Sequence, residues 1–312
     1  MAAVTPALIK ELRELTGSGM SDCKKALDET AGDIKKAIEF LREKGLATAA
    51  KKAGRIAAEG IVHVLVKDDQ SEAIIVEVNA ETDFVAKNEE FRTFVANVAA
   101  QALASSTDDM DTFMAEKWAA DPSLTVKEAL AGKIATIGEN LNIRRFTRMK
   151  RQNPGVFATY IHGGGKIGVI LDVECAVQSD ALIEMGRNLC MQTAALFPKY
   201  VKSEDMSAEF IESERRIIVE QIKNDEKSAG KPEAVIAKMV DGRLKKQLKE
   251  VCLQEQEYVK NTDMTVKQYV DGVAKEIGSA ITLARFACFE KGEGIEKKEE
   301  DFAAEVNKVM QG

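Results

Sequence analysis

The sequence is poor in the residues from which most catalytic and metal sites are built. It has only two histidines, His63 and His162, and five cysteines that form no C-x-x-C pair. Scattered cysteines in odd number are typical of reduced thiols rather than of a disulfide framework. No G-x-S-x-G nucleophile elbow is present, and the lysine of "HGGGK" is followed by isoleucine, which rules out a phosphate loop. We therefore expect no catalytic residues, no metal and no cofactor, hence a protein that is not an enzyme.

Long apolar runs and an excess of positive charge are also missing. No apolar run reaches the roughly 18 residues that a transmembrane helix needs, and "MAAVTPALIKELRE" becomes charged too early for a secretory signal. A net charge of −7 and a pI near 5.3 disfavour direct binding to nucleic acid, which normally needs a basic surface. Hydrophobic residues at 45% can form a packed core, and charged residues at 30% can cover it. We expect a cytoplasmic globular protein without a membrane partner.

The first 46 residues predict a module of three short helices. Pro6 can start the first helix and Gly17 can end it, while Ser21 and Asp33 can cap the second and third. Cys23 lies on an amphipathic helix and is interpreted as small core filler. Residues 47–59 are rich in alanine, lysine and glycine and predict a linker to the main body.

The main body contains an internal repeat. "GIVHVLVKDDQSEAIIVEV", from Gly60, aligns without gaps on "GVFATYIHGGGKIGVILDV", from Gly155. Each copy predicts a β-hairpin, with His63 in a structural position inside a strand. A helix follows in both copies, and there Asn97 aligns with Asn188 and Gln101 with Gln192. The pattern predicts two related α+β subdomains, one of residues 60–153 and one of residues 154–201 and 242–291.

An antiparallel helical hairpin is predicted at residues 202–241, inside the second subdomain. The apolar positions of its second arm, which follow a spacing of four, are Ile236, Val240, Leu244 and Leu248. So narrow an apolar stripe indicates two helices that pack mainly on each other, as in a coiled coil. The C-terminal residues 292–312 predict a module with a short amphipathic helix that uses Phe302.

The step from strand to helix is four residues longer in the first copy than in the second. The extra residues lie in "VNAETDFVAKNEEF", which contains Asp83 and Phe84. Phe84 has two interpretations: it staples the next helix by packing on Val85 or Phe91, or it points outward. The second copy makes the same transition without these residues, which favours an outward, functional Phe84. His162, at a hairpin tip beside three glycines, is more often a tolerated turn residue.

Several long motifs occur in a fixed order: "ELTGSGMSDCKKAL", "NAETDFVAKNEEF", "IGENLNIRR", "HGGGKIGV", "DGRLKKQLKEV" and "FEKGEGIEKKEEDFAAEV". In these motifs, and over essentially its whole length, the chain resembles the bacterial elongation factor Ts family, the guanine nucleotide exchange factors of elongation factor Tu. The resemblance implies an N-terminal module similar to a ubiquitin-associated domain, two α+β core subdomains, an inserted coiled-coil hairpin and a C-terminal module. Residues 105–133, which include Trp118, are longer than in many members.

The resemblance also implies which residues bind the partner. Thr82, Asp83, Phe84 and Val85 would reach into the G domain of elongation factor Tu and disturb its Mg²⁺ site, so that GDP is released. Further contacts are implied at Met20, Asp22, Ile137, Gly138, His162 and Phe302. The factor would bind both the GDP-bound and the nucleotide-free partner.

Two alternatives stay open at this point. Arg144 and Arg145 in "IGENLNIRR" are either part of the partner contact or merely solvated. The helical hairpin differs among family members in whether it forms a homodimer. A non-catalytic interaction or oligomerisation protein of the same fold, which uses that hairpin, is therefore the alternative function.

Overall fold

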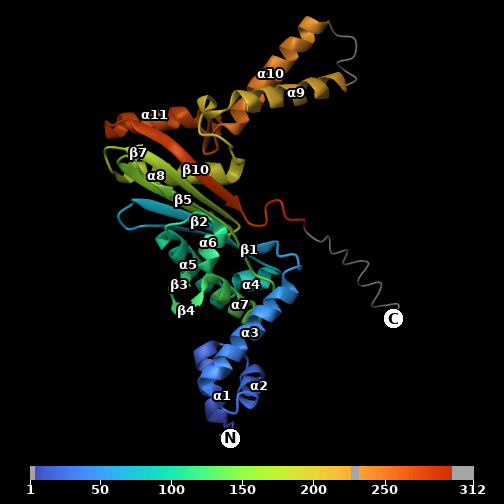
Figure 1. Cartoon of the computed structure of the whole chain (residues 1–312). Helices are drawn as coiled ribbons and strands as arrows, with labels where there is room; N and C mark the ends of the chain where they lie inside the picture. The colour runs from blue at the N-terminus through green and yellow to red at the C-terminus, as the bar shows by residue number, and fades with distance from the viewer. Residues whose placement is uncertain (1–3, 226–231, 297–312) are drawn as a thin grey trace.

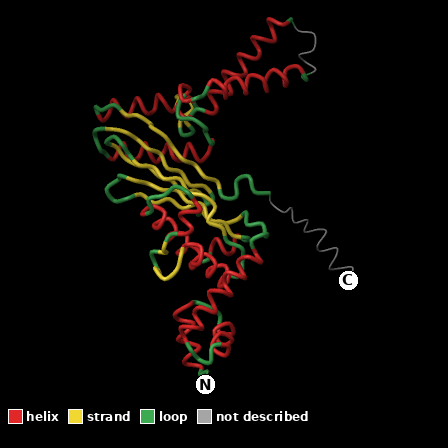
Figure 2. The backbone as a smooth tube through the Cα atoms, in the orientation of Figure 1, coloured by secondary structure: helices red, strands yellow, loops and turns green. Residues whose placement is uncertain are grey.

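The computed structural model describes residues 4–225 and 232–296, which form a mixed α+β protein (Figures 1 and 2). Three helices come first, then two three-stranded sheets with helices on their outer sides, and a helical pair that extends from the body. No helix within the described ranges is long and apolar enough to cross a membrane.

The N-terminal module consists of α1 (Pro6–Thr16), α2 (Met20–Glu29) and α3 (Ile34–Lys52). Gly17 ends α1 in the left-handed conformation, and the Asp33 carboxylate caps α3 by accepting from the Lys36 amide at 3.1 Å, both as predicted. The prediction for Ser21 was wrong, because α2 begins before it with Gly19 at its N-cap. The module's buried core is small: Leu12, Cys23, Ala26, Leu27 and Ala37.

The predicted linker at residues 47–59 was wrong for its first half. Helix α3 continues through Lys52 and packs along α7 (Val126–Ile137), with Gly45 against the backbone of Ala131. Ala58, beyond the end of α3, is buried as well. The N-terminal module is thus joined to the body by a packed helix rather than by a free tether.

Each copy of the repeat forms a β-hairpin and receives a third strand from later in the chain. The first sheet has the order β1 (Glu59–Val66), β2 (Glu72–Ala80) and β5 (Asn142–Lys150), and the second β6 (Gly155–His162), β7 (Ile167–Cys175) and β10 (Ile281–Glu290). All neighbouring strands are antiparallel. Both predicted hairpins are confirmed.

The two sheets pack face to face, and helices cover their outer faces. The residues buried between the sheets include Val62, Ile75, Phe157, Ile170 and Phe289. On the first sheet lie α4 (Asp83–Lys87) and α5 (Glu89–Ala104), with α6 (Met110–Ala115) beside α7; on the second lie α8 (Asp180–Leu196) and α11 (Val266–Ile277). Because both faces of the central strands are covered, β2 and β7 are buried along nearly their whole length.

In the structure, the repeat extends beyond the hairpin and helix in which the sequence shows it. Strands β3 (Lys117–Trp118) and β4 (Asp121–Thr125) precede α7 and β5, as β8 (Glu257–Tyr258) and β9 (Asn261–Thr265) precede α11 and β10. Gln101 bonds to the Lys117 carbonyl and the Ala119 amide, and Gln192 makes the same pair of bonds to Glu257 and Val259. Residues 105–133 therefore contain the first copy's counterpart of a unit that the second copy also has.

The helical pair lies in the second copy, between α8 and β8. Its arms are α9 (Ala208–Lys223) and α10 (Glu233–Val251), with short 3-10 helices at Ser203–Asp205 (η1) and Leu253–Glu255 (η3). The arms pack through Ile218, Ile222, Val240 and Leu244. The predicted end of the hairpin at residue 241 was wrong, because the second arm continues to Val251.

Candidate functional site

The extra residues of the first copy form a short helix, α4, at the exit of strand β2. The Thr82 hydroxyl accepts from the Val85 amide at 3.4 Å and so caps the helix. Asn88 begins the next helix, α5, by accepting from the Glu90 amide at 2.7 Å and the Phe91 amide at 3.3 Å. Two successive caps thus fold the added segment as a separate helical turn ahead of α5.

Helix α4 turns small apolar residues inward and its one large aromatic outward. Ala86 is buried and Val85 packs partly against the core of the first subdomain. The Phe84 side chain is 79% exposed, whereas Phe91 is fully buried. The ring of Phe84 therefore does not staple the helix but points outward, whereas its functional role stays a prediction.

Asp83 is exposed beside Phe84 and pairs with Lys87 one turn later. Their charged groups are 2.6 Å apart, and the Lys87 ammonium lies 6.0 Å from the centre of the Phe84 ring. The hydrogen bond from Lys87 lowers the pKa of Asp83 below its ordinary value. Exposed pairs of this kind are worth little in stability. Asp83 therefore stays available as an ionised group next to an exposed aromatic ring.

The predicted contacts Ile137 and Gly138 lie at the end of α7, just before the residue that contacts the cap of α4. Gly138 ends α7 in the left-handed conformation, and its carbonyl accepts from the Lys52 ammonium of α3. The following residue, Glu139, accepts hydrogen bonds from Thr82. Through Glu139, the structure thus joins the end of α7 to Thr82, although the two segments are distant in sequence.

The other predicted contacts lie on separate elements. Met20 is 49% exposed at the start of α2, and Asp22 in the same turn pairs with Lys44 at 2.5 Å. His162 is exposed at the end of β6, where its Nδ1 lies 3.0 Å from the Tyr160 hydroxyl oxygen. Phe302 lies outside the described residues.

Arg144 and Arg145 are not merely solvated, so that alternative was wrong. Both donate to the fully buried carboxylate of Glu77, at 3.0 Å and 2.6 Å. Glu77 also accepts from the amide of Gly292, which follows β10. Burial alone would raise the pKa of Glu77, but these bonds, together with one from Asn79, outweigh it and lower the pKa below its ordinary value.

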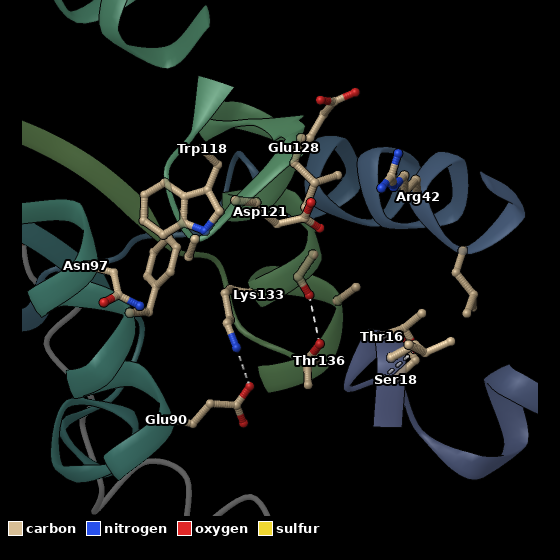
Figure 3. A pocket seen from close by; sticks show the side chains of 18 of the residues that line it. Thr16, Ser18, Arg42, Glu90, Asn97, Trp118, Asp121, Glu128, Lys133 and Thr136 are labelled. Atoms are coloured by element: carbon tan, nitrogen blue, oxygen red, sulfur yellow. Dashed lines mark hydrogen bonds and ion pairs between the residues drawn. The ribbon is translucent and has the colours of Figure 1, made fainter. Parts of the chain in front are cut away.

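A cleft of about 500 Å³ lies between the N-terminal module and the first subdomain (Figure 3). Trp118 and Asn97 are on its subdomain side and Arg42 of α3 on the opposite side, and Lys133 pairs with Glu90 across 2.7 Å. Within the described part of the chain, no group of three or more His, Cys, Asp or Glu side chains could hold a metal ion.

Comparison with known proteins gives the family. The family model described as Elongation factor TS matches residues 81–293. Proteins named "Elongation factor Ts" from Clostridium tetani and Clostridium novyi are each 50% identical, over 308 and 307 residues, and the alignments cover 99% and 98% of this chain and 100% and 99% of the relatives. The one from Clostridioides difficile is 49% identical over 310 residues, which is 99% of this chain and 100% of the relative. The chain belongs to the elongation factor Ts family.

In this member of the elongation factor Ts family, two functional candidates escaped the sequence analysis. Glu139 contacts the cap of α4, and Glu77 joins the first sheet to the segment after β10. The available signal was the second half of the repeat, in which Glu139 corresponds to Ser279 at the same place after a helix-ending glycine. A gapless comparison of residues 117–146 with residues 257–286 would have marked Glu139 as specific to the first copy.

The same comparison explains the cleft. In the second copy, Asn188 accepts from the Lys260 ammonium at 2.7 Å and donates to the Tyr269 hydroxyl at 3.0 Å. The first copy has Asn97 in place of Asn188 and alanines, Ala120 and Ala129, in place of the two partners. Space that long side chains fill in one copy is left open in the other and is bordered by the N-terminal module.

Proposed function

We propose that this chain is a translation elongation factor that binds elongation factor Tu carrying GDP and promotes release of the GDP. The observation that carries the proposal is Phe84, which is 79% exposed on a helix whose other apolar residues are anchored in the core. A large rigid aromatic presented in this way is typical of the few anchors that dominate a protein interface. Membership of the family supplies the partner.

The proposed mechanism needs no bond breaking by this protein, so we propose that it is not an enzyme and uses no cofactor. Thr82, Asp83, Phe84 and Val85 insert beside the partner's nucleotide site. Mg²⁺ there offsets charge between the phosphates and the G domain, so displacing it weakens GDP binding. The ring of Phe84 acts as the wedge, and Asp83 adds a negative charge at the surface.

Thermodynamic linkage then gives the direction of the cycle. A protein that lowers the partner's affinity for GDP is itself bound less tightly, by the same factor, when nucleotide is present. The factor therefore prefers nucleotide-free elongation factor Tu and leaves when GTP binds. We place this cycle in the cytoplasm, without direct contact to nucleic acid or membrane.

We assign secondary contacts to the residues that family resemblance implies. Met20 and Asp22 of the N-terminal module, which we take to be similar to a ubiquitin-associated domain, would touch the G domain, as would Ile137 and Gly138. His162 would lie near the partner, and the second subdomain would face the partner's third domain.

The test is release of a fluorescent GDP analogue from elongation factor Tu, measured with the wild-type protein and with Phe84→Ala. The proposal expects strong acceleration by the wild type and loss of most of it in the variant. Acceleration that survives in Phe84→Ala would keep the activity but remove the wedge. No acceleration by folded wild-type protein would overturn the proposal.

A second candidate function is oligomerisation through α9 and α10. What favours it is that Ile217 and Val235, on these helices, are 48% and 42% exposed although the pair has a core of its own. A homodimer through this hairpin would sediment as a dimer at micromolar concentration, and Ile217→Lys would convert it to a monomer. A monomeric wild-type protein at those concentrations would exclude this candidate.

A further inference from the structure

The loop that follows α7 holds the strand exit from which α4 starts. The carboxylate of Glu139 accepts from the backbone amides of Glu81 and Thr82, at 3.1 Å and 3.0 Å, through one oxygen. Its other oxygen accepts from the Thr82 hydroxyl at 2.7 Å. Hydrogen bonds to an ionised carboxylate are stronger than those between neutral groups. One side chain thus ties down two consecutive residues immediately before α4.

Hydrogen bonds also run in the opposite direction, from the loop after α7 to the strand exit. The carboxylate of Glu81 accepts from the backbone amide of Asn140 at 2.5 Å, and the Asn140 side chain donates to the Arg55 carbonyl at 2.8 Å. Arg55 lies 3.5 Å from Glu81 in turn. Two loops therefore exchange carboxylate-to-backbone bonds, and the segment after α3 is bonded to both. Such an exchange fixes the two loops relative to each other more firmly than one bond would.

The position of Phe84 depends on these hydrogen bonds because most of its side chain lies outside the core. The side chain is 79% exposed, so its position follows from the backbone of α4. That backbone is held on its inner side by Val85 and Ala86 and at its start by Thr82, which is both the helix cap and the residue that Glu139 binds. Release of Thr82 would free the start of a helix only five residues long.

The second copy of the repeat has neither a counterpart of α4 nor a carboxylate at the position of Glu139. Its strand β7 leads to α8 without a counterpart of α4, and Ser279 stands where the first copy has Glu139. Ser279 lies 3.5 Å from Cys175, at the end of β7. A carboxylate at this position thus accompanies the added helix and is not required by the shared fold.

We propose that Glu139 is a positioning residue that holds Thr82, and through it the ring of Phe84, in the geometry needed to displace GDP. The assignment rests on the proposed exchange function, because it names a residue that supports the same wedge. Glu139 needs no contact with the partner in this role. Misplacement of an inserted group by a fraction of an ångström to 1 Å can cost one to two orders of magnitude in rate.

The experiment measures release of a fluorescent GDP analogue from elongation factor Tu at increasing concentrations of the full-length factor. Glu139→Ala should lower the maximal release rate about tenfold. The matched control is Glu128→Ala: the Glu128 carboxylate also accepts from the amide and hydroxyl of a helix-capping threonine, Thr125, at 2.7 Å and 2.9 Å. The control should stay within about twofold of wild type while losing a comparable cap.

A double variant separates positioning from direct contact. If Glu139 acts through the ring, Glu139→Ala should slow release no further in a Phe84→Ala background. A double variant that is slower by the product of both single effects would overturn the proposal, because Glu139 would then act independently of Phe84. Glu139→Gln retains one acceptor oxygen and should fall between wild type and Glu139→Ala.

Amide hydrogen exchange of the free protein gives a readout that does not depend on the partner. Glu139→Ala should speed exchange of the amides of residues 81–86 at least about tenfold, and Glu128→Ala should leave them unchanged. Unchanged exchange in Glu139→Ala would overturn the proposal even if the release rate fell. If the wild-type protein does not accelerate GDP release, the proposed exchange function itself is overturned. If the wild type is active and Phe84→Ala is inactive, but Glu139→Ala releases GDP at the wild-type rate, only the positioning role of Glu139 is overturned.

Discussion

The two copies of the repeat place an acid at the same position of their central strands, yet its environment differs. Glu77 in β2 and Asp172 in β7 are both buried and lie opposite an arginine of the third strand, Arg145 or Arg285. The pKa of Glu77 is lowered. Burial raises the pKa of Asp172 above its ordinary value, and Arg285 only partly opposes that effect.

A bulge in the third strand explains the difference. In both copies the pairing shifts by one residue beside the acid, and the additional residue is Arg144 in β5 but Ala284 in β10. Arg144 gives Glu77 a second guanidinium, whereas one oxygen of Asp172 has no hydrogen-bond partner among the residues that the structure describes. The two copies thus share the same backbone bulge, and the side chain at the bulged position decides how well the buried acid is paired.

The largest expected loss of stability concerns a feature that both copies share, the glycine at the start of each hairpin. Gly60 and Gly155 begin their hairpins where a Cβ would lie 2.2 Å from the Val78 carbonyl oxygen and 2.1 Å from that of Val173. Replacing either glycine by alanine should lower the free energy of unfolding by about 3 kcal/mol or more in urea denaturation. Gly132→Ala, in a helix with open space around it, should be neutral or stabilising. Clearly unequal losses at the two glycines would show that the hairpins are not equivalent.

The next effect sharpens the contrast between the two acids. Glu77→Gln leaves two guanidinium groups facing a neutral side chain and should cost about 3 kcal/mol of unfolding free energy. Asp172→Asn removes a charge that the folded protein tolerates poorly and should change stability by less than about 1 kcal/mol. Urea denaturation at pH 7 measures both. Equal losses would contradict the account based on the bulge.

Phe84 and Val177 lie in the segments that follow the two central strands, and both side chains are exposed. Substituting each by alanine compares the functions of the two segments. Phe84→Ala should slow GDP release from elongation factor Tu about 30-fold or more, whereas Val177→Ala should change it by less than about twofold. Both variants should keep their unfolding free energy within about 0.5 kcal/mol of wild type, because exposed side chains contribute little to stability. A strong effect of Val177→Ala would place function in both copies.

The smallest effect concerns pH. The pKa of Glu77 is lowered in the folded state, so its stabilisation is complete above the ordinary value near 4.5 and is lost as the pH falls through the folded value. The pKa of Asp172 is raised, so its ionisation opposes folding as the pH rises above the ordinary value near 3.8.

Urea denaturation between about pH 3 and pH 6 should therefore give slopes of opposite sign for the two acids. The gap between wild type and Glu77→Gln should widen with rising pH, while Asp172→Asn should gain stability relative to wild type. Slopes of the same sign would contradict the two assigned shifts.

Much of the scaffold was predictable because its signals are local. Alternation of apolar residues and a gapless alignment from Gly60 and Gly155 predicted both hairpins, and the longer first copy indicated that Phe84 points outward. The second half of the repeat was missed because its buried side chains differ, as with Trp118 and Tyr258, although its backbone elements agree. Its matching signals were the capping boxes at Thr125 and Thr265.

The sequence by itself determined the N-terminal helices, the two β-hairpins with the helix after each, the helical pair and the family, since caps, periodicity and motifs act between residues close along the chain. Only the tertiary structure decided what holds Thr82 and what Glu77 binds. Glu139 reaches Thr82 across 57 residues, and Gly292 reaches Glu77 across 215. No local propensity encodes such bonds. The first forms only when β5 pairs with β2, and the second only when the two sheets pack on each other, because these steps bring distant segments within hydrogen-bond distance.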